Sequence, residues 1–338
     1  MKVCSKILLF SLIIILLSGC SRLPVSETKS LMGTEVIITI HSHDSRLKGE
    51  YLFTAMDDAF REIERIEELT KYNEMRSLNG YAGFQPAFIG NELISLIDHA
   101  YIIANATSGA FRPDLGPLIS LWEIGTERER IPEVWEIDDA LNVIEETYFS
   151  VLDSGMAELY PKDAHLDLGA IAKGYAVDRA CKVLQESGVT AGMVWAGGDL
   201  KVFGTKPDHS QWRIAVRHPR NPEEFLTTLL IDSGAVATSG DYERYFEVDG
   251  NRYHHIFNPE QGYPALASIA TTVFMKDCMD ADAYATAFFV LGPEKGISVA
   301  NDLAIPAIIV DEKGSKLNVT QNDRFARLVE EDSPLENK

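Results

Sequence analysis

Four clusters in this 338-residue chain combine residue types that can bind phosphate or metal, or move a proton. The first runs from Asp167 through Lys173 to Asp178, with the sequence DLGAIAKGYAVD. We expect a strand to end in the glycine turn and a helix to begin after it. Free N–H groups at a helix start, with a lysine nearby, can hold an anion. The alternative is a junction whose glycines only permit the turn, and spacing alone does not separate the two.

The second and third clusters contain paired glycines and paired histidines. In Ala196–Asp199 two glycines permit a ligand to approach the backbone, but such pairs more often form a turn, which we favour. The third cluster spans Thr238–Arg244 and the segment 253–259, which includes His254 and His255. Histidine is the most frequent general base. Because neighbours on a strand face opposite sides, only one of the pair can point into a given site.

The fourth cluster places Asp282 and Thr286 four residues apart, on one face of a predicted helix. Mg²⁺ prefers oxygen ligands and is typically held by one or two carboxylates together with substrate phosphates and water. The alternative is a helix start with acids near its positive end, and spacing alone favours it. Since the sequence has no Walker loop, Rossmann fingerprint, G-x-S-x-G or zinc spacing, any nucleotide site must be built differently.

Hydrophobic patterning predicts the elements that position these clusters. Helical spacing of apolar residues predicts helices at 50–70, 92–106, 171–186 and 280–291. Extended patterns predict strands at 34–41, 148–152, 165–168, 193–203, 212–217, 227–231, 245–248, 253–257, 269–274 and 305–310. Because helices and strands do not alternate strictly, we expect an α+β fold with mainly antiparallel sheets.

The N-terminus predicts export. Lys2 and Lys6 lead into the apolar run 7–17, which ends in Leu-Ser-Gly before Cys20. We expect residues 1–19 to be a lipoprotein signal peptide, Cys20 to be acylated, and residues 20–30 to form a tether. The protein would then be lipid-anchored on the periplasmic side of a bacterial membrane, with the inner membrane preferred. The alternative is an ordinary signal peptide that happens to contain Cys20.

Charge and cysteine content restrict the partners. The formal net charge of −20 repels nucleic acid, so we expect no nucleic-acid partner. Beyond Cys4 and Cys20, two cysteines remain, Cys181 and Cys278. In an oxidising compartment they can form a disulfide or stay as two separately buried thiols, and both interpretations remain open.

Taken in order, these clusters resemble the FAD:protein FMN transferase family, the ApbE-type flavin transferases. The resemblance begins at Met32-Gly33-Thr34, takes in Tyr72, Asn79 and the segment 109–113, and continues through all four clusters. Each motif is short, but their order along nearly all of the mature chain is specific. The resemblance implies a flavin transferase domain at 31–330, made of two intertwined T-fold-like subdomains with flanking helices and the flavin in a cleft.

The resemblance also implies the activity. FMN would be transferred from FAD, in a Mg²⁺-dependent reaction, to a Thr or Ser hydroxyl of a target protein, with release of AMP. Subunits of membrane redox pumps and related flavoproteins would be the acceptors. Two rival functions remain: a Mg²⁺-dependent FAD pyrophosphatase that uses water and gives FMN and AMP, and a lipid-anchored flavin-binding protein without catalysis.

The resemblance further implies roles for individual residues. His255 would be the base near the acceptor hydroxyl. Mg²⁺ would be held by the backbone carbonyl of Ala170 with Asp282 and Thr286. The residues implied to line the FAD site are Met32, Tyr72, Ala110, Phe111, Arg112, Asp167, Lys173 and Ile256. Two positions depart from the family pattern, because Arg112 and Asn258 stand where the family usually has Asp.

Overall fold

The computed structural model describes residues 24–41, 49–314, 316–331 and 333. The predicted leader and Cys20 therefore lie outside the described residues. Within the described ranges, no helix is long and apolar enough to cross a membrane.

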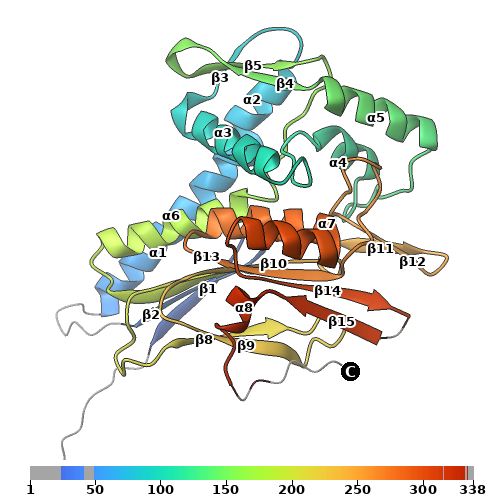
Figure 1. Cartoon of the computed structure of the whole chain (residues 1–338). Helices are drawn as coiled ribbons and strands as arrows, with labels where there is room; N and C mark the ends of the chain where they lie inside the picture. The colour runs from blue at the N-terminus through green and yellow to red at the C-terminus, as the bar shows by residue number, and fades with distance from the viewer. Residues whose placement is uncertain (1–23, 42–48, 315, 332, 334–338) are drawn as a thin grey trace, which may run out of the picture.

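An antiparallel sheet forms the base of the molecule (Figure 1). In spatial order its described strands are β1 (Val25–Leu31), β2 (Thr34–His41), β6 (Ala191–Ala196), β7 (Asp199–Phe203), β10 (Gly234–Gly240), β13 (Ala270–Met275), β14 (Ala307–Lys313) and β15 (Lys316–Gln321). Every neighbouring pair is antiparallel. The predicted α+β class with antiparallel sheets is confirmed, whereas the division into two T-fold-like subdomains stays a prediction.

Three helices cover one face of this sheet: α1 (Gly49–Glu67), α6 (Ala172–Glu186) and α7 (Cys278–Asp302) (Figure 1). Each buries an apolar stripe, as in α1, where Phe60, Ile63 and Ile66 are fully buried. The opposite face is covered by the hairpin β8 (Trp212–Arg217) and β9 (Phe225–Ile231) together with α8 (Asp323–Ala326). The central strands of the sheet are therefore covered on both faces.

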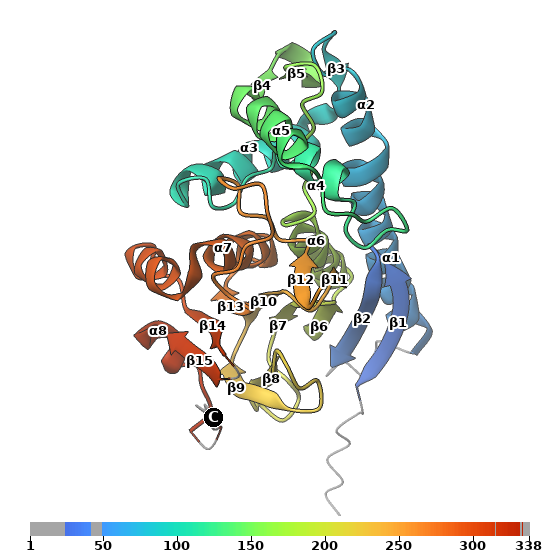
Figure 2. The ribbon, with the colours of Figure 1, turned by 90° about the vertical axis from the view of Figure 1, so that its right-hand side faces the viewer.

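A smaller lobe stands above the three helices (Figures 1 and 2). Its elements are α2 (Glu74–Gly80), α3 (Gly90–Ala106), α4 (Gly116–Trp122), α5 (Val134–Glu146), β3 (Ala87–Phe88), β4 (Tyr148–Val151) and β5 (Met156–Tyr160). Below α4 and α5 lies the hairpin β11 (Tyr245–Val248) and β12 (Asn251–His254). Trp122 and Phe257 pack together there, so the hairpin region is joined to this lobe by a shared apolar cluster.

Several predicted elements differ from the structure. Residues His165–Leu168 are not a strand, because their backbone pairs with irregular partners: Leu166 N donates to the side chain of Asn79 at 2.9 Å, and Asp167 N to the Pro113 carbonyl at 2.7 Å. The predicted strand 193–203 is instead the β6–β7 hairpin, which turns at Gly197 and Gly198. The turn interpretation of this glycine pair is confirmed.

The predicted tether is partly wrong. Val25–Leu31 pairs along its full length with β2 as an edge strand. The side chains of Val25, Glu27, Lys29 and Leu31 are half-buried, and the Ser and Thr residues between them are exposed. Polar edge strands of this kind carry little hydrophobic signal, which is why the segment resembled a linker.

The ends of the long helices also differ from the prediction. The helix predicted to reach residue 70 ends at Glu67, and a π-helical turn follows at Glu68–Tyr72. α7 continues past the predicted end at residue 291, but it has a break there, because Gly292 has a φ of 76° and Pro293 follows. Cys181 and Cys278 are separate buried thiols and form no disulfide.

Candidate functional site

A cavity of about 460 Å³ lies where the sheet, its covering helices and the upper lobe meet. Its walls come from the β1–β2 turn, the end of α1, the β6–β7 turn, α7 and the segments 110–124, 167–173, 238–244 and 255–257. The site residues expected from the sequence that line it are Met32, Ala110, Phe111, Arg112, Asp167, Ala170, Lys173, His255, Ile256, Asp282 and Thr286. The fold therefore brings together residues that are spread over most of the chain.

Tyr72 is the one described candidate that does not line the cavity, and its expected place in the FAD site stays a prediction. The π-helical turn at the end of α1 directs Thr70 and Lys71 to the cavity. The Tyr72 ring is 40% exposed and lies 5.2 Å from the Lys71 ammonium.

The start of α6 forms a tight turn at the cavity. Asp167 Oδ1 accepts a hydrogen bond from Gly169 N at 2.8 Å, and α6 begins at Ala172. Two N–H groups that could bind an anion are already used, because Ala172 N donates to the Leu168 carbonyl and Gly174 N donates to Asp282 Oδ2 at 3.1 Å. Phosphate binding here would therefore depend more on Lys173 than on the helix end.

Lys173 lies between two carboxylates. Its ammonium donates to Asp199 Oδ2, and it lies 3.5 Å from Asp282 Oδ2. Burial lowers the pKa of Lys173, but the two negative charges outweigh this effect and raise it above its ordinary value. The lysine is therefore a fixed cation beside the Asp282 carboxylate, and it can hold the oxygens of an anionic ligand.

Asp282 and Thr286 lie one turn apart on α7, and both line the cavity. Asp282 is 4% exposed, and the Thr286 hydroxyl is 3.2 Å from the Ser239 hydroxyl of β10. Among the described residues, no group of three or more His, Cys, Asp or Glu side chains could hold a metal ion. One carboxylate with a hydroxyl and a nearby backbone carbonyl fits Mg²⁺ when phosphate and water complete its coordination.

The two adjacent histidines face different environments, as predicted. His254 is buried and donates from Nε2 to the Ala265 carbonyl at 2.8 Å. His255 lines the cavity, and its Nδ1 lies 3.2 Å from the Arg244 carbonyl. Because a carbonyl only accepts, Nδ1 carries the proton and Nε2 of the neutral ring has the free lone pair. Burial and the positive charge of Arg244 lower the pKa of His255 to about 3.

Two other side chains shape the rim of the cavity. Arg112 donates to both carboxylate oxygens of the buried Asp114, at 2.7 and 2.9 Å, and to the Ile144 carbonyl. The hydrogen bond to Ile144 joins the cavity wall to α5. Met32 has a left-handed φ of 52°, and Glu67 at the end of α1 accepts a hydrogen bond from its N–H at 2.9 Å. Glu67 thus holds a strained turn against the cavity.

Comparison with known proteins identifies the family. The sequence model of the ApbE family matches residues 32–309. The chain belongs to the ApbE family. A FAD:protein FMN transferase of Vibrio cholerae (strain O395) is 32% identical over 312 residues, which cover 88% of this chain and 91% of the relative. One from Klebsiella pneumoniae (strain 342) is 33% identical over 318 residues, with 90% and 94% covered.

Solved structures of ApbE proteins share this fold. The crystal structure of the ApbE protein from Thermotoga maritima superposes with a TM-score of 0.82 at 31% identity, covering 91% of this chain and all of that one. The apo form of the flavinyl transferase ApbE from Pseudomonas stutzeri gives a TM-score of 0.78 at 28% identity, with 90% and 96% covered.

Sequence reasoning missed several residues of the site in this ApbE-family chain. The sequence indicated Asp199 only as part of a glycine turn, yet its carboxylate accepts a hydrogen bond from Lys173. Glu67, Lys71 and Arg244 line the cavity but were not named as site residues, although Arg244 ends one of the four clusters. The only sequence signal for these residues was a charged side chain beside a turn. Their contacts in the site depend on chain segments that are distant in sequence.

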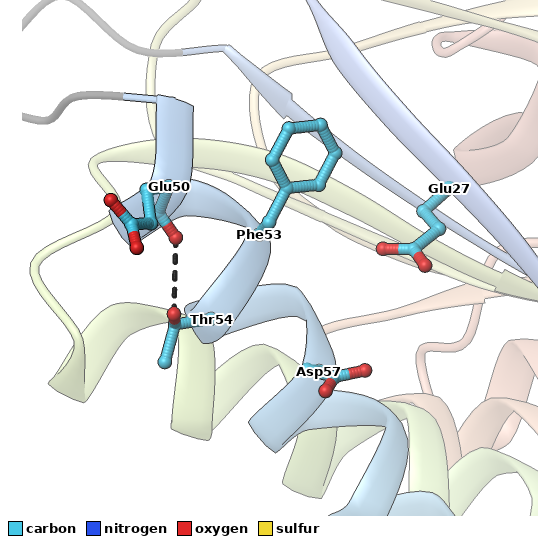
Figure 3. Close-up of a pocket in the computed structure, with 5 residues that line it drawn as sticks. All are labelled: Glu27, Glu50, Phe53, Thr54 and Asp57. Carbon is cyan, nitrogen blue, oxygen red and sulfur yellow. Dashed lines mark hydrogen bonds between the residues drawn. The ribbon is translucent and has the colours of Figure 1, made fainter.

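A second hollow, of about 590 Å³, lies on the outer side of α1 and β1 (Figure 3). It is lined by Glu27, Glu50, Phe53, Thr54 and Asp57. Asp57 pairs with Lys29 at 2.7 Å, and the Thr54 hydroxyl donates to the Glu50 carbonyl within the helix. The lining of this hollow contains neither a histidine nor a lysine, so we assign the chemistry to the other cavity.

Proposed function

We propose that this chain is a FAD:protein FMN transferase. The observation that carries the proposal is one cavity that gathers a fixed lysine, a carboxylate–hydroxyl pair on α7 and a neutral histidine. Lysine and a metal suit a diphosphate, and a neutral imidazole suits the removal of a hydroxyl proton. The relatives from Vibrio and Klebsiella are named for this activity, and the chain aligns with nearly their full lengths.

In the proposed reaction, the oxygen of a Thr or Ser hydroxyl on the acceptor protein attacks the phosphorus of the FMN half of FAD. A new P–O bond forms, the bond from this phosphorus to the bridging oxygen breaks, and AMP leaves with that oxygen. The hydroxyl proton passes to Nε2 of His255, the nitrogen with the free lone pair. Lys173 orients the diphosphate and offsets its negative charge.

The residues present fit Mg²⁺, and we propose that Asp282, Thr286 and the Ala170 carbonyl hold it. When bound there, Mg²⁺ would offset charge on the diphosphate and on the departing AMP. Asp282 is already oriented without a metal, because Gly174 N donates to its Oδ2 at 3.1 Å.

We also propose the cellular setting from the sequence. Acylation of Cys20 would anchor the enzyme on the periplasmic side of a bacterial membrane, preferably the inner membrane. The acceptors would be subunits of membrane redox pumps or related flavoproteins, which lie at the same surface. Labelling with radioactive palmitate, compared between the native chain and Cys20→Ser, tests this anchor, and equal labelling of both would contradict it.

One incubation tests the activity. The protein is mixed with FAD, Mg²⁺ and a Ser- or Thr-containing acceptor domain, and the products are separated on a denaturing gel and by chromatography. A fluorescent acceptor band with released AMP is the expected result. FMN and AMP with an unlabelled acceptor would indicate a pyrophosphatase, and intact bound FAD would indicate a binding protein.

A further inference from the structure

α7 has to present Asp282 and Thr286 to the cavity, yet the residue before the helix does not secure its first turn. Asp277 is extended, and its side chain makes no capping hydrogen bond. The first N–H groups of a helix have no partner inside the helix. Those of Cys278 and Met279 therefore need acceptors from another part of the fold.

Asp178 on α6 supplies both acceptors. Its Oδ1 accepts from Cys278 N at 3.0 Å, and its Oδ2 accepts from Met279 N at 2.9 Å. Lys201 on β7 donates to the same carboxylate at 2.6 Å and to Asp277 at 3.0 Å. A carboxylate at this end of a helix is also favoured by the helix dipole. One side chain thus joins α6, α7 and β7.

Gly174, one turn earlier on α6, contacts the same turn of α7. A Cβ at this position would lie 2.2 Å from the Cys278 carbonyl oxygen, so only glycine permits the observed approach. The N–H of Gly174 donates to Asp282. α6 therefore holds the start of α7 at two points, and the second contact ends on the proposed metal ligand.

We propose that Asp178 is a positioning residue for the magnesium site. By capping α7 from α6, it fixes the rotation and axial position of the helix, and with them the Asp282 carboxylate and the Thr286 hydroxyl one and two turns further on. Its own side chain is 17% exposed and does not line the cavity, so it acts only through the backbone of α7. This inference rests on the proposed function.

The test measures metal binding rather than turnover. Binding of Mn²⁺ to the full-length chain in the presence of FAD is followed by electron paramagnetic resonance, and FAD binding without metal is measured separately. Asp178→Ala removes both caps, and we expect Mn²⁺ binding to weaken by about 10- to 100-fold, as when other supports of metal ligands are removed. Asp178→Asn keeps one acceptor oxygen, so we expect a loss of several-fold. Metal-free FAD binding should stay unchanged in both.

The matched control is Asp57→Asn, which makes the same change of charge at a half-exposed acid on α1 (Figure 3). It should bind Mn²⁺ as the native chain does. If Asp178→Ala does not fold, Asp178→Asn carries the test. Native Mn²⁺ affinity in the folded Asp178 variants would overturn the proposal, as would an equal loss of Mn²⁺ and metal-free FAD binding. A native chain that transfers FMN but binds no Mn²⁺ would overturn it together with the metal site, but not the activity.

Discussion

His254 and His255 differ in function because each has a different set of hydrogen-bond partners. His254 donates through Nε2 to Ala265 and accepts through Nδ1 from the N–H of Ile256, so both nitrogens are used. His255 uses only Nδ1, toward Arg244. The first is thus a structural neutral histidine, and the second is a neutral histidine that can accept a proton.

We expect His255→Ala to lower kcat for FMN transfer by about 10²- to 10⁴-fold, the usual contribution of a general base. Because its pKa is lowered to about 3, His255 stays neutral from pH 5 to 8. The pH profile of kcat/KM in the native enzyme should therefore show no step near 6.5 from this residue. A step near 6.5 that disappears in His255→Ala would contradict the assignment of its charge state.

Arg112 stabilises the cavity wall through the buried carboxylate of Asp114, whose side chain is 3% exposed. Replacing the arginine leaves the buried carboxylate without its hydrogen-bond donor, so we expect Arg112→Met to lower the free energy of unfolding by about 1–3 kcal/mol. The control is Arg128→Met, which breaks an ion pair at a side chain that is 79% exposed and should cost less than about 0.5 kcal/mol. Urea denaturation measures both, and equal losses would disprove the special role of Arg112.

At the level of secondary structure, the site depends on the close approach of α6 and α7. Gly174 and Asp178 belong to the DLGAIAKGYAVD cluster, which the sequence connected with phosphate binding. The structure gives much of this cluster a different task, because these two residues and Lys173 orient α7 and its Asp282. A motif can therefore contribute to a site indirectly, by positioning the neighbouring helix that bears the ligand-binding side chains.

Gly174→Ala should separate these helices. The added Cβ would lie 2.2 Å from a backbone oxygen, which cannot move aside cheaply. We expect a loss of about 1–3 kcal/mol in the free energy of unfolding, the usual cost of overpacking. In Gly80→Ala, the added Cβ has nothing within 4 Å, so this helical control should be neutral or slightly stabilising. Urea midpoints that fall equally in both variants would contradict the proposed contact.

Element prediction from the sequence succeeded where an apolar stripe marks one face of an element and failed where the pairing of strands decides whether a segment is regular. α1 follows its apolar stripe almost to the predicted end. β1 alternates polar residues at an edge, and the segment 165–168 looks like a strand but finds no strand partner. Both errors depend on pairing with residues that are distant in sequence, which local pattern does not contain.

For the whole molecule, the motifs taken in order predicted a set of residues of which all but Tyr72 line one cavity among the described residues, while their individual roles stay predictions. Asp199 and Asp178 were not recognised because their roles exist only once β7 and α7 pack against α6. The sequence therefore indicated side chains that could bind a ligand or move a proton, but not the residues of neighbouring elements that hold them in position.

Four histidines with shifted pKa values predict how stability depends on pH. Burial lowers the pKa of His165, His254 and His255, whereas a hydrogen bond to Asp280 raises that of His99. With a lowered pKa, the folded chain binds fewer protons than the unfolded chain below pH 6.5, so folding stability should fall as pH decreases. The slope is up to about 1.4 kcal/mol per pH unit for each fully buried histidine.

Thermal unfolding between pH 5 and 7 measures this effect. We expect a lower Tm at pH 5, and a weaker dependence in His254→Gln, since that histidine is 2% exposed and must stay neutral. His99 contributes in the opposite direction, because its stabilisation is present below pH 6.5 and is lost as pH rises through its raised pKa. A Tm that rises on acidification would contradict the dominance of the three histidines with lowered pKa, because His99 and Asp199, whose pKa burial raises to about 7, both favour the folded state at low pH.

The amount of AMP released for each acceptor molecule that gains FMN, compared between the native chain and Asp282→Asn, distinguishes a transferase from the alternatives. We predict one AMP per flavinylated acceptor in the native enzyme with Mg²⁺, and neither product above background in the Asp282 variant. AMP released without a mass increase of the acceptor, or full transfer by the Asp282 variant, would contradict a metal-assisted flavin transferase.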